Sequence, residues 1–308
     1  MGGKRMAFSL ALSGGGCRGA AHIGVLMALE EAGLRPAALS GASAGAIVAG
    51  LFAYGYAAKD LKQIAASLTP RLVDPDLFGI LRAVGQLAGG RRVTLSGLLR
   101  GERLHRWLTK LTGGMPISSV VLPISVAAVD LAAGETVAFC DRPLKRRLAN
   151  TRCETDVPLA DAIAASCCVP AVFAPRRIGG GLLVDGGVTD NLPVDLLLAR
   201  DLPHCPVVAI DVSSEYAPPE GECLFDLASH SLSMMSRRLR DCTVRGEQLL
   251  CRPRLPQEAG LFTFDQIGPC MEAGYRAAKE LTGVIGALGG KSANRRNRKR
   301  CGCRSRPP

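Results

Sequence analysis

Short apolar segments alternate along the first part of the chain with longer segments whose apolar residues recur at helical spacing. Residues 7–12 form a short apolar run that leads into a glycine run, which is typical of a buried strand. Residues 18–33 have helical spacing and end in Gly33, a residue that commonly ends helices. A second short strand over 36–40 and a helix over 43–56, rich in Ala and Gly, follow. This strand–helix–strand–turn–helix order predicts a parallel α/β sheet.

The rest of the chain continues the alternation without an internal repeat. Residues 59–114 have a mostly helical pattern. Beyond them we predict strands over 122–128, 135–139, 182–184 and 207–212, and helices over 160–166, 193–200, 226–250 and 269–287. No linker composition interrupts the chain before residue 290, so we expect one domain over 1–290 and a tail over 291–308.

The formal charge of +11 comes mostly from the C-terminus. Residues 291–308 contain eight Lys or Arg and no acidic residue, so the remaining chain carries only +3. The tail is polar and lacks apolar periodicity, which predicts disorder. Its partner could be an anionic membrane surface or nucleic acid, or it could be a solvated tail without a specific partner. The body has no basic stripe interleaved with aromatic residues, so nucleic-acid binding is not expected as the main role.

The composition predicts a cytoplasmic protein, which could also associate peripherally with a membrane. No segment reaches roughly 18 uninterrupted apolar residues, and the apolar run after Arg5 is shorter than that of a secretory signal peptide. Twelve cysteines are spread irregularly over the chain, which favours reduced, buried thiols over a disulfide framework. The close pairs at 167–168 and 301–303 have no further Cys or His cluster beside them. We therefore predict neither a metal site nor a cofactor.

The candidate chemistry begins with a serine between small residues. Gly41-Ala42-Ser43-Ala44-Gly45 follows a predicted strand and starts a predicted helix, which is the place of the nucleophile in a Gly-x-Ser-x-Gly turn. The turn is so sharp that the flanking residues must be very small, and the helix directs its N-terminal N–H groups towards the hydroxyl. The motif alone fits equally well a Gly/Ala-rich packing turn with an incidental serine.

A glycine-rich loop lies one helix length upstream of this serine. Adjacent glycines let several backbone N–H groups converge on a negative oxygen. Gly14, Gly16 and Gly19 also satisfy the G-x-G-x-x-G pattern of dinucleotide-binding loops. That interpretation requires an acidic residue at the end of the second strand, where residues 40–43 are Ser-Gly-Ala-Ser instead. The favoured interpretation is an oxyanion hole formed by Gly14, Gly15, Gly16, Cys17, Arg18 and Gly19.

No histidine stands in a context that predicts a general base for Ser43. The four histidines, at 22, 105, 204 and 230, lie in predicted helices or loops without a motif. Asp185 instead follows an apolar strand and precedes Gly186 and Gly187, which places its carboxylate at the C-terminal edge of a strand, where sites form in parallel sheets. A partly buried aspartate within hydrogen-bond reach could accept the serine proton directly. The alternative is an ordinary cap, because Asp-Gly-Gly is common in turns.

These three motifs, in this order, resemble those of the patatin-like phospholipases. The segments Ala165–Pro170 and Asn191–Pro193 are also similar to bacterial members of that family, and the resemblance extends over about residues 7–285. It implies a three-layer α/β/α fold with a mainly parallel central sheet, and a Ser–Asp dyad in place of a triad. Ser43 would be the nucleophile and Asp185 the base. The glycine loop would form the oxyanion hole, with Arg18 shaping or supporting it and Cys17 at the family's variable position.

The resemblance also implies the activity. We expect a metal-independent serine acyl hydrolase that cleaves fatty-acyl esters of lipids, commonly phospholipids or lysophospholipids. An acyltransferase with the same acyl-enzyme, or a non-catalytic lipid-binding regulatory protein, would carry the same fold. The apolar helical segment from Leu77 to Leu111 is a candidate acyl-chain wall or lid, with plain core packing as the alternative.

Overall fold

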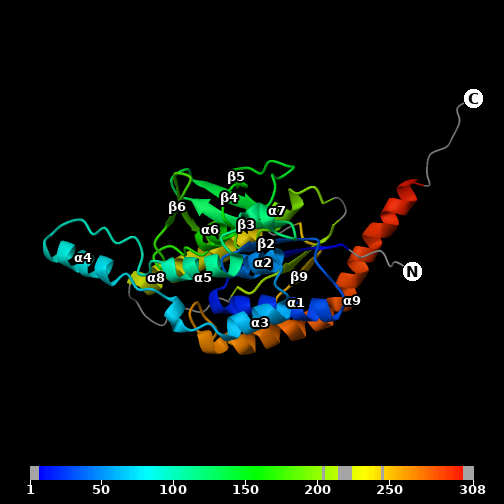
Figure 1. Cartoon of the computed structure of the whole chain (residues 1–308), viewed down its shortest axis with the longest axis horizontal. Coiled ribbons are helices and arrows are strands. Elements are labelled where there is room, and N and C mark those ends of the chain that lie inside the picture. The colour runs from blue at the N-terminus through cyan, green and yellow to red at the C-terminus, as the bar shows by residue number, and fades with distance from the viewer. Residues whose placement is uncertain (1–6, 203–204, 214–223, 244–245, 301–308) are drawn as a thin grey trace, which may run out of the picture.

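The centre of the molecule is a mixed β-sheet (Figure 1). The computed structural model describes residues 7–202, 205–213, 224–243 and 246–300. Within these ranges the sheet has nine strands; seven lie in the order β5-β4-β3-β2-β1-β8-β9, while β7 pairs with β3 and β6 pairs with β7. The strands are β1 (Ser9–Leu12), β2 (Ala38–Ala42), β3 (Ile124–Asp130), β4 (Glu135–Cys140), β5 (Thr151–Glu154), β6 (Arg176–Ile178), β7 (Gly181–Asp185), β8 (Val207–Ile210) and β9 (Leu249–Cys251).

Most neighbouring strands of the sheet run parallel. β1 pairs in parallel with β2 and with β8, and the pairs β2–β3, β4–β5 and β8–β9 are also parallel. The antiparallel pairs are β3–β4, β3–β7 and β6–β7. The mainly parallel sheet predicted from the strand–helix alternation is therefore confirmed.

Helices on both faces of the sheet make the three layers that the sequence predicts (Figure 1). On one side α1 packs along α9 and against α3, while α7 covers β1 and β8 on the other side. The helices are α1 (Ala20–Glu31), α2 (Ala44–Tyr54), α3 (Ala58–Ala66), α4 (Leu77–Ala88), α5 (Glu102–Thr112), α6 (Leu159–Ser166), α7 (Val194–Leu198), α8 (Leu224–Thr243) and α9 (Ile267–Arg300).

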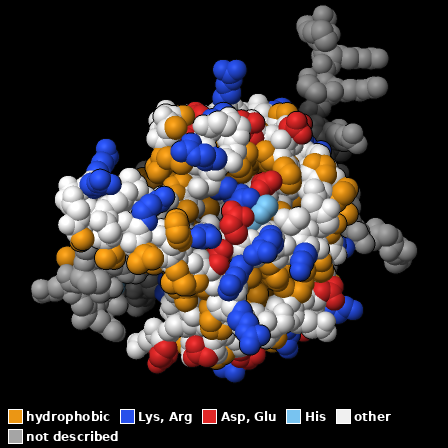
Figure 2. All heavy atoms as spheres, turned by 60° about the vertical axis from the view of Figure 1, so that its left-hand side comes forward, with side chains coloured by type: hydrophobic (Ala, Val, Ile, Leu, Met, Phe, Trp, Pro, Cys, Tyr) orange, Lys and Arg blue, Asp and Glu red, His pale blue; other side chains and the backbone are white. Residues whose placement is uncertain are grey.

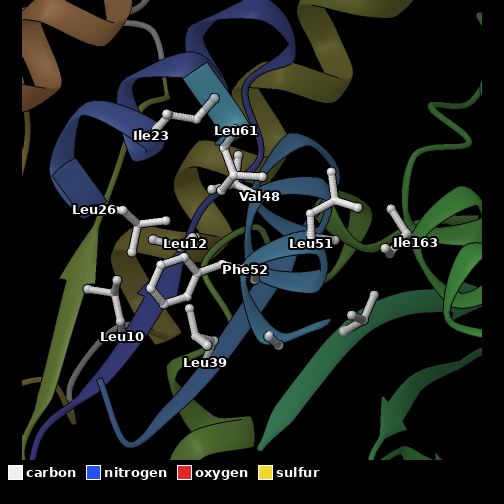
Figure 3. Close-up of a cluster of buried hydrophobic side chains, with 14 of the residues drawn as sticks. Leu10, Leu12, Ile23, Leu26, Leu39, Val48, Leu51, Phe52, Leu61 and Ile163 are labelled. Carbon is white, nitrogen blue, oxygen red and sulfur yellow. The ribbon is translucent and has the colours of Figure 1, made fainter. Parts of the chain in front are cut away.

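Strand β1 shows how the sheet divides its two apolar layers. Successive side chains of a strand point to opposite faces. Leu10 and Leu12 belong to the large core cluster that includes α1 and α2, whereas Ala11 packs on the opposite face with α7. Figure 3 shows Phe52 of α2 lying over Leu10 and Leu39 of the sheet. Because both faces are buried, β1 appears in the sequence as a nearly continuous apolar run.

The predicted elements at the start of the chain are confirmed, and three short strands are additions. The predicted strand–helix–strand–turn–helix order appears as β1, α1, β2 and α2, and Gly33 follows the end of α1 with φ of +68°. The predicted strands over 122–128 and 135–139 form the antiparallel pair β3–β4. β5, β6 and β9 have three or four residues each; β5 and β6 are mostly polar and so lack the apolar run that marks β1 and β8. β9 lies inside the predicted helix 226–250, so that helix is shorter than predicted and ends at Thr243.

The last helix is longer than predicted. The sequence predicts a helix over 269–287 and disorder from 291, whereas α9 continues to Arg300 and extends beyond the sheet (Figure 1). Lengthening an existing helix adds one hydrogen bond for each residue that becomes ordered and needs no new nucleus. Residues 301–308 lie outside the described part of the chain, and the domain boundary at 290 stays a prediction. No helix in the described ranges combines the length and apolar character needed to cross a bilayer.

Candidate active site

Ser43 lies at the sharp turn between β2 and α2. Its backbone has φ of 51° and ψ of −123°, outside the regions that L-residues usually occupy. Strain of this kind persists only where the surrounding structure holds it, and it is frequent at functional sites. Gly45 passes so close to β1 that a Cβ there would lie 2.3 Å from the Leu12 carbonyl oxygen. The turn also contains the small residues that end β2 and begin α2, namely Gly41, Ala42 and Ala44.

Strand β3 brings Asp185 to Ser43 across a long stretch of sequence. β2 pairs in parallel with the first half of β3 and ends with Ala42 opposite Ala127. β7 pairs antiparallel with the second half of the same edge and ends with Asp185 opposite Ala128. β2 and β7 therefore run towards each other, and their C-terminal ends meet at neighbouring residues of β3. Ser43 directly follows Ala42, so the serine and the carboxylate share this junction.

The Asp185 carboxylate is buried, and the turn formed by Gly186 and Gly187 holds one of its oxygens. The Gly187 N–H donates to Oδ1 at 2.7 Å. Burial raises the pKa of Asp185 to about 6, and the Ser43 side chain and the Gly187 N–H limit that rise because they favour the ionised form. Among the described residues, Oδ2 makes no well-aligned hydrogen bond. The Ser43 side chain lies close enough to the carboxylate to favour its ionised form.

The glycine loop between β1 and α1 faces the same junction. A Cβ built on Gly14 would lie 3.0 Å from the Ser43 Cβ, so the loop and the serine are in contact, and Gly19 ends the loop against α2. Within the described ranges, the N–H groups of Gly15 and Gly16 have no hydrogen-bond acceptor. Two neighbouring unpaired N–H groups beside a serine are the arrangement that an oxyanion hole requires. Backbone carbonyl groups already accept from the N–H groups of Gly14, Cys17 and Arg18.

The segment before α9 holds this loop in place. The Arg18 guanidinium donates to the Ala259 carbonyl at 2.9 Å, and the Cys17 N–H donates to the Gly260 carbonyl at 3.1 Å. Gly16 has φ of +59°, and a Cβ there would lie 2.6 Å from the Leu261 Cα, so this position requires glycine. The contact of Arg18 is of the supporting kind that the family resemblance implies.

Ser166, at the end of α6, contacts the serine turn and is not among the predicted site residues. Its Oγ accepts a hydrogen bond from the Ser43 N–H at 2.8 Å and donates to the Ala127 carbonyl at 2.6 Å. Ser166 is fully buried, so it ties the strained turn to β3. A serine at the end of an alanine-rich helix has no motif of its own, and only the resemblance of segment 165–170 to the family points to it.

Asn191 is a second residue that the motifs miss. Its carbonyl oxygen accepts from the Gly14 N–H at 3.1 Å, and its Nδ2 donates to the Ser213 hydroxyl at 3.2 Å. A Cβ on Gly187 would lie 2.8 Å from the Asn191 Oδ1. Asn191 therefore lies between the glycine loop and the Asp-Gly-Gly turn and fixes their spacing.

His22 and His105 are bonded to groups other than Ser43 and Asp185. His22 is fully buried in α1, with its Nε2 2.8 Å from the Ser13 carbonyl oxygen, so Nε2 carries the proton. Burial lowers the pKa of His22 to about 4, which keeps the ring neutral. His105 contacts Asp161 at 2.8 Å, and His204 lies outside the described residues. Neither His22 nor His105 has a hydrogen bond to Ser43, whereas the Ser43 side chain interacts with the Asp185 carboxylate.

An apolar cavity adjoins Ser43 and is lined by residues of α1, α2, α3, α5 and α9 and of the segment that follows α6. Among the described residues that line it, Ser43 alone carries a hydroxyl group. Burial raises the pKa of the Cys17 thiol, which also lines it, to about 11, so that thiol is neutral at ordinary pH. The segment from Leu77 to Leu111 is the predicted acyl-chain wall or lid. Of this segment, Leu104 and Trp107 of α5 line the cavity, whereas no residue of α4 does.

No group of His, Cys, Asp and Glu side chains is suited to hold a metal ion in the part of the chain that the structure describes. The cysteines described there are free thiols, and Cys167 and Cys168 are buried. Cys301 and Cys303 lie outside the described residues.

Comparison with known proteins identifies the family. The model of the patatin-like phospholipase family matches residues 10–198, which include the glycine loop, Ser43 and Asp185. The chain belongs to the patatin-like phospholipase family. This patatin-like chain is 34% identical over 235 residues to an uncharacterized NTE family protein of Mycobacterium tuberculosis, covering 74% of this chain and 55% of that protein. It is 30% identical over 207 residues to the mouse patatin-like phospholipase domain-containing protein 6, covering 67% of this chain and 14% of that protein.

A solved structure shares the patatin-like fold of the chain. VipD from Legionella pneumophila aligns over 92% of this chain and 67% of its own, with a TM-score of 0.50 and 15% identity. At this identity the likeness to VipD shows a shared fold and nothing further. The patatin-like chain spans about half the length of the mycobacterial relatives that it matches. Family membership supports a lipid acyl hydrolase.

Proposed function

We propose that the chain hydrolyses fatty-acyl esters of lipids through Ser43 and Asp185. The observation that carries the proposal is the junction on β3, where a strained serine meets a buried carboxylate. The unpaired N–H groups of Gly15 and Gly16 and the apolar cavity beside Ser43 support it. A nucleophile, a base, donors for an oxyanion and a site for an acyl chain are the parts that ester hydrolysis needs.

In the first half-reaction Ser43 attacks the ester carbonyl carbon. Asp185 takes the proton from the Ser43 Oγ as the new carbon–oxygen bond forms. The carbonyl oxygen becomes negative and accepts hydrogen bonds from the N–H groups of Gly15 and Gly16. When the intermediate collapses, the ester bond breaks and the leaving alcohol takes the proton from Asp185. The acyl group remains on Ser43.

In the second half-reaction water replaces the alcohol. Asp185 accepts a proton from the water as the water oxygen attacks the acyl carbon. Collapse of this intermediate releases the fatty acid, and Asp185 returns the proton to Ser43. The pKa of about 6 suits Asp185 to this cycle, because the carboxylate is ionised at neutral pH and yet more basic than an exposed aspartate.

The test measures fatty-acid release from a short-chain ester and from a phospholipid. We expect activity in the parent, and a loss of about a thousandfold or more in Ser43→Ala and in Asp185→Asn. Ser40→Ala is the matched control, because Ser40 is a buried serine of β2 whose Oγ donates to the Pro193 carbonyl at 2.7 Å. An inactive parent, or a fully active Ser43→Ala, contradicts the proposal. Acyl transfer to added glycerol or lysolipid in preference to water would make the chain an acyltransferase.

A further inference from the structure

Helix α4 turns its large apolar side chains towards solvent. The large apolar side chains of α4 recur at helical spacing, and their exposed fractions lie between 59% and 72%: Leu77, Phe78, Leu81, Val84 and Leu87. In Figure 1 this helix stands apart from the rest of the molecule. A contiguous apolar face of this kind is uncommon on a surface that contacts only water, and it marks a site of interaction.

The opposite side of α4 is the one that faces its own chain. Gly79 is buried, and Ile80, Ala83 and Gln86 are half-buried. The Gln86 Nε2 donates a hydrogen bond to the Thr94 hydroxyl at 3.0 Å, and the Thr94 N–H donates to the Gln86 Oε1 at 3.0 Å. Thr94 belongs to the loop that follows α4. Ile80 is thus the one large apolar side chain of α4 that is partly covered, and the other five point outward, whereas an ordinary surface helix turns its apolar side inward.

The base of α4 is firmly held. Asp76 caps the helix by accepting from the Gly79 N–H at 3.1 Å, and Arg100 donates to the same carboxylate oxygen at 2.8 Å. The Asp76 N–H also donates to the Leu98 carbonyl at 2.8 Å. These bonds join the N-terminal end of α4 to the loop before α5.

The segment that leads into α4 forms part of the wall of the apolar cavity beside Ser43. Leu72 and Val73 line that cavity, and α4 begins four residues after Val73. Phe262 also lines the cavity and is itself exposed. Only three residues of the chain therefore separate the lining of this cavity from the first apolar residue of α4.

The segment around α4 is strongly basic. Residues 71–110 contain eight Lys or Arg and three acidic residues. Each of the three acids has a partner, since Asp74 accepts from N–H groups at the start of α5, Asp76 pairs with Arg100, and Glu102 lies 3.9 Å from Arg176. Figure 2 shows Lys and Arg side chains spread over this side of the molecule with apolar side chains between them.

We propose that α4 docks on an anionic lipid bilayer surface, with its apolar side chains inserted at the interface and the surrounding arginines on the lipid head groups. An outward apolar face flanked by basic residues is the pattern of interfacial helices. A second copy of the chain would fit less well, because one side of a helix of this length offers about 300 Å². A stable protein interface needs roughly 800 Å² on each partner. Docking here would bring the cavity entrance to the lipid that the proposed hydrolase consumes.

The test is cosedimentation of the full chain with vesicles of phosphatidylcholine, with and without about one third phosphatidylglycerol. We expect the parent to bind the anionic vesicles, and the double variant Phe78→Ser/Leu81→Ser to bind at least about tenfold more weakly. The control Val121→Ser/Leu131→Ser removes two exposed apolar side chains on other loops and should bind as the parent does. Arg91→Gln/Arg92→Gln should weaken binding to anionic vesicles and make it less sensitive to salt.

Vesicle binding is measured without any reaction, so its outcome is independent of the proposed hydrolysis. All these variants should keep the parental rate on a monomeric short-chain ester. A parent that does not bind anionic vesicles overturns the docking proposal. So does a Phe78→Ser/Leu81→Ser variant that binds as tightly as the parent, which would assign binding to another segment. A parent that self-associates through α4, and whose association the same variant abolishes without any change in vesicle binding, also overturns it.

Discussion

Replacing Asp185 with asparagine should stabilise the protein at neutral pH while it removes the proposed base. Burial raises the pKa of Asp185 from its ordinary 3.8 to about 6. Between these two values the native state holds a proton that the unfolded chain has released, so the free energy of unfolding falls as pH rises. The shift of about 2 pH units corresponds to a loss of about 3 kcal/mol, complete above pH 6.

Asparagine is neutral at every pH, so it avoids this loss. It also keeps an oxygen that can accept from the Gly187 N–H. Relative to the parent, the free energy of unfolding of Asp185→Asn should rise by about 3 kcal/mol at pH 8 and by less than about 1 kcal/mol at pH 4. Groups such as His22, whose pKa burial lowers to about 4, contribute equally to both proteins and cancel in the comparison.

Urea unfolding of both proteins at pH 4 and pH 8 measures the difference. Asp156→Asn, an exposed aspartate in a loop, is the matched control and should change little at either pH. A variant no more stable than the parent at pH 8 would refute the argument that the Asp185 carboxylate is desolvated. An equal gain at both pH values would refute it too, because the gain would then come from something other than charge.

Three further predictions concern catalysis. The kcat/KM for a short-chain ester should fall tenfold for each pH unit below about pH 6, as protonation removes the Asp185 base; a profile flat down to pH 4 would exclude that role. Gly16→Ala should abolish ester hydrolysis, because its Cβ would lie 2.6 Å from the Leu261 Cα. The control Gly33→Ala is also at positive φ but has open space around it, so it should cost only about 1 kcal/mol of stability. Equal effects of the two variants on activity would contradict this prediction. Ser166→Ala leaves the Ser43 N–H without its acceptor and should lower kcat about ten- to a hundredfold at unchanged KM, while Ser40→Ala should lower stability alone; the same kcat in both variants would remove Ser166 from the positioning of Ser43.

Much of the fold can be predicted from local patterns, because both faces of the central strands are buried. β1 is recognisable as a short apolar run before the glycine loop, and α1 as a longer segment with apolar residues at helical spacing. The strands β6 and β9 have three residues each, and their place depends on pairing partners far away in the sequence. Non-local pairing of this kind leaves no periodic trace in the segment itself.

The candidate site shows the same division between local and non-local information. Ser43 and the glycine loop are recognisable because a sharp turn and a close backbone approach demand particular small residues. Ser166 is missed because its importance comes only from its distance to Ser43 and Ala127 in the folded chain. For α4 the spacing predicts an amphipathic helix, but spacing alone does not tell which side faces the protein.

β2 and β7 meet end to end on one edge of β3, so the geometry of the proposed Ser43–Asp185 dyad does not depend on the length of chain between the two residues. Ser43 and Asp185 are 142 positions apart, yet two neighbouring residues of β3 set their spacing. Insertions or exchanges in the stretch that carries α3, α4 and α5 leave that spacing untouched as long as β3 keeps its register. This stretch is therefore the natural place to graft segments from relatives, and such chimaeras should acquire new lipid preferences without any retuning of the serine or its base.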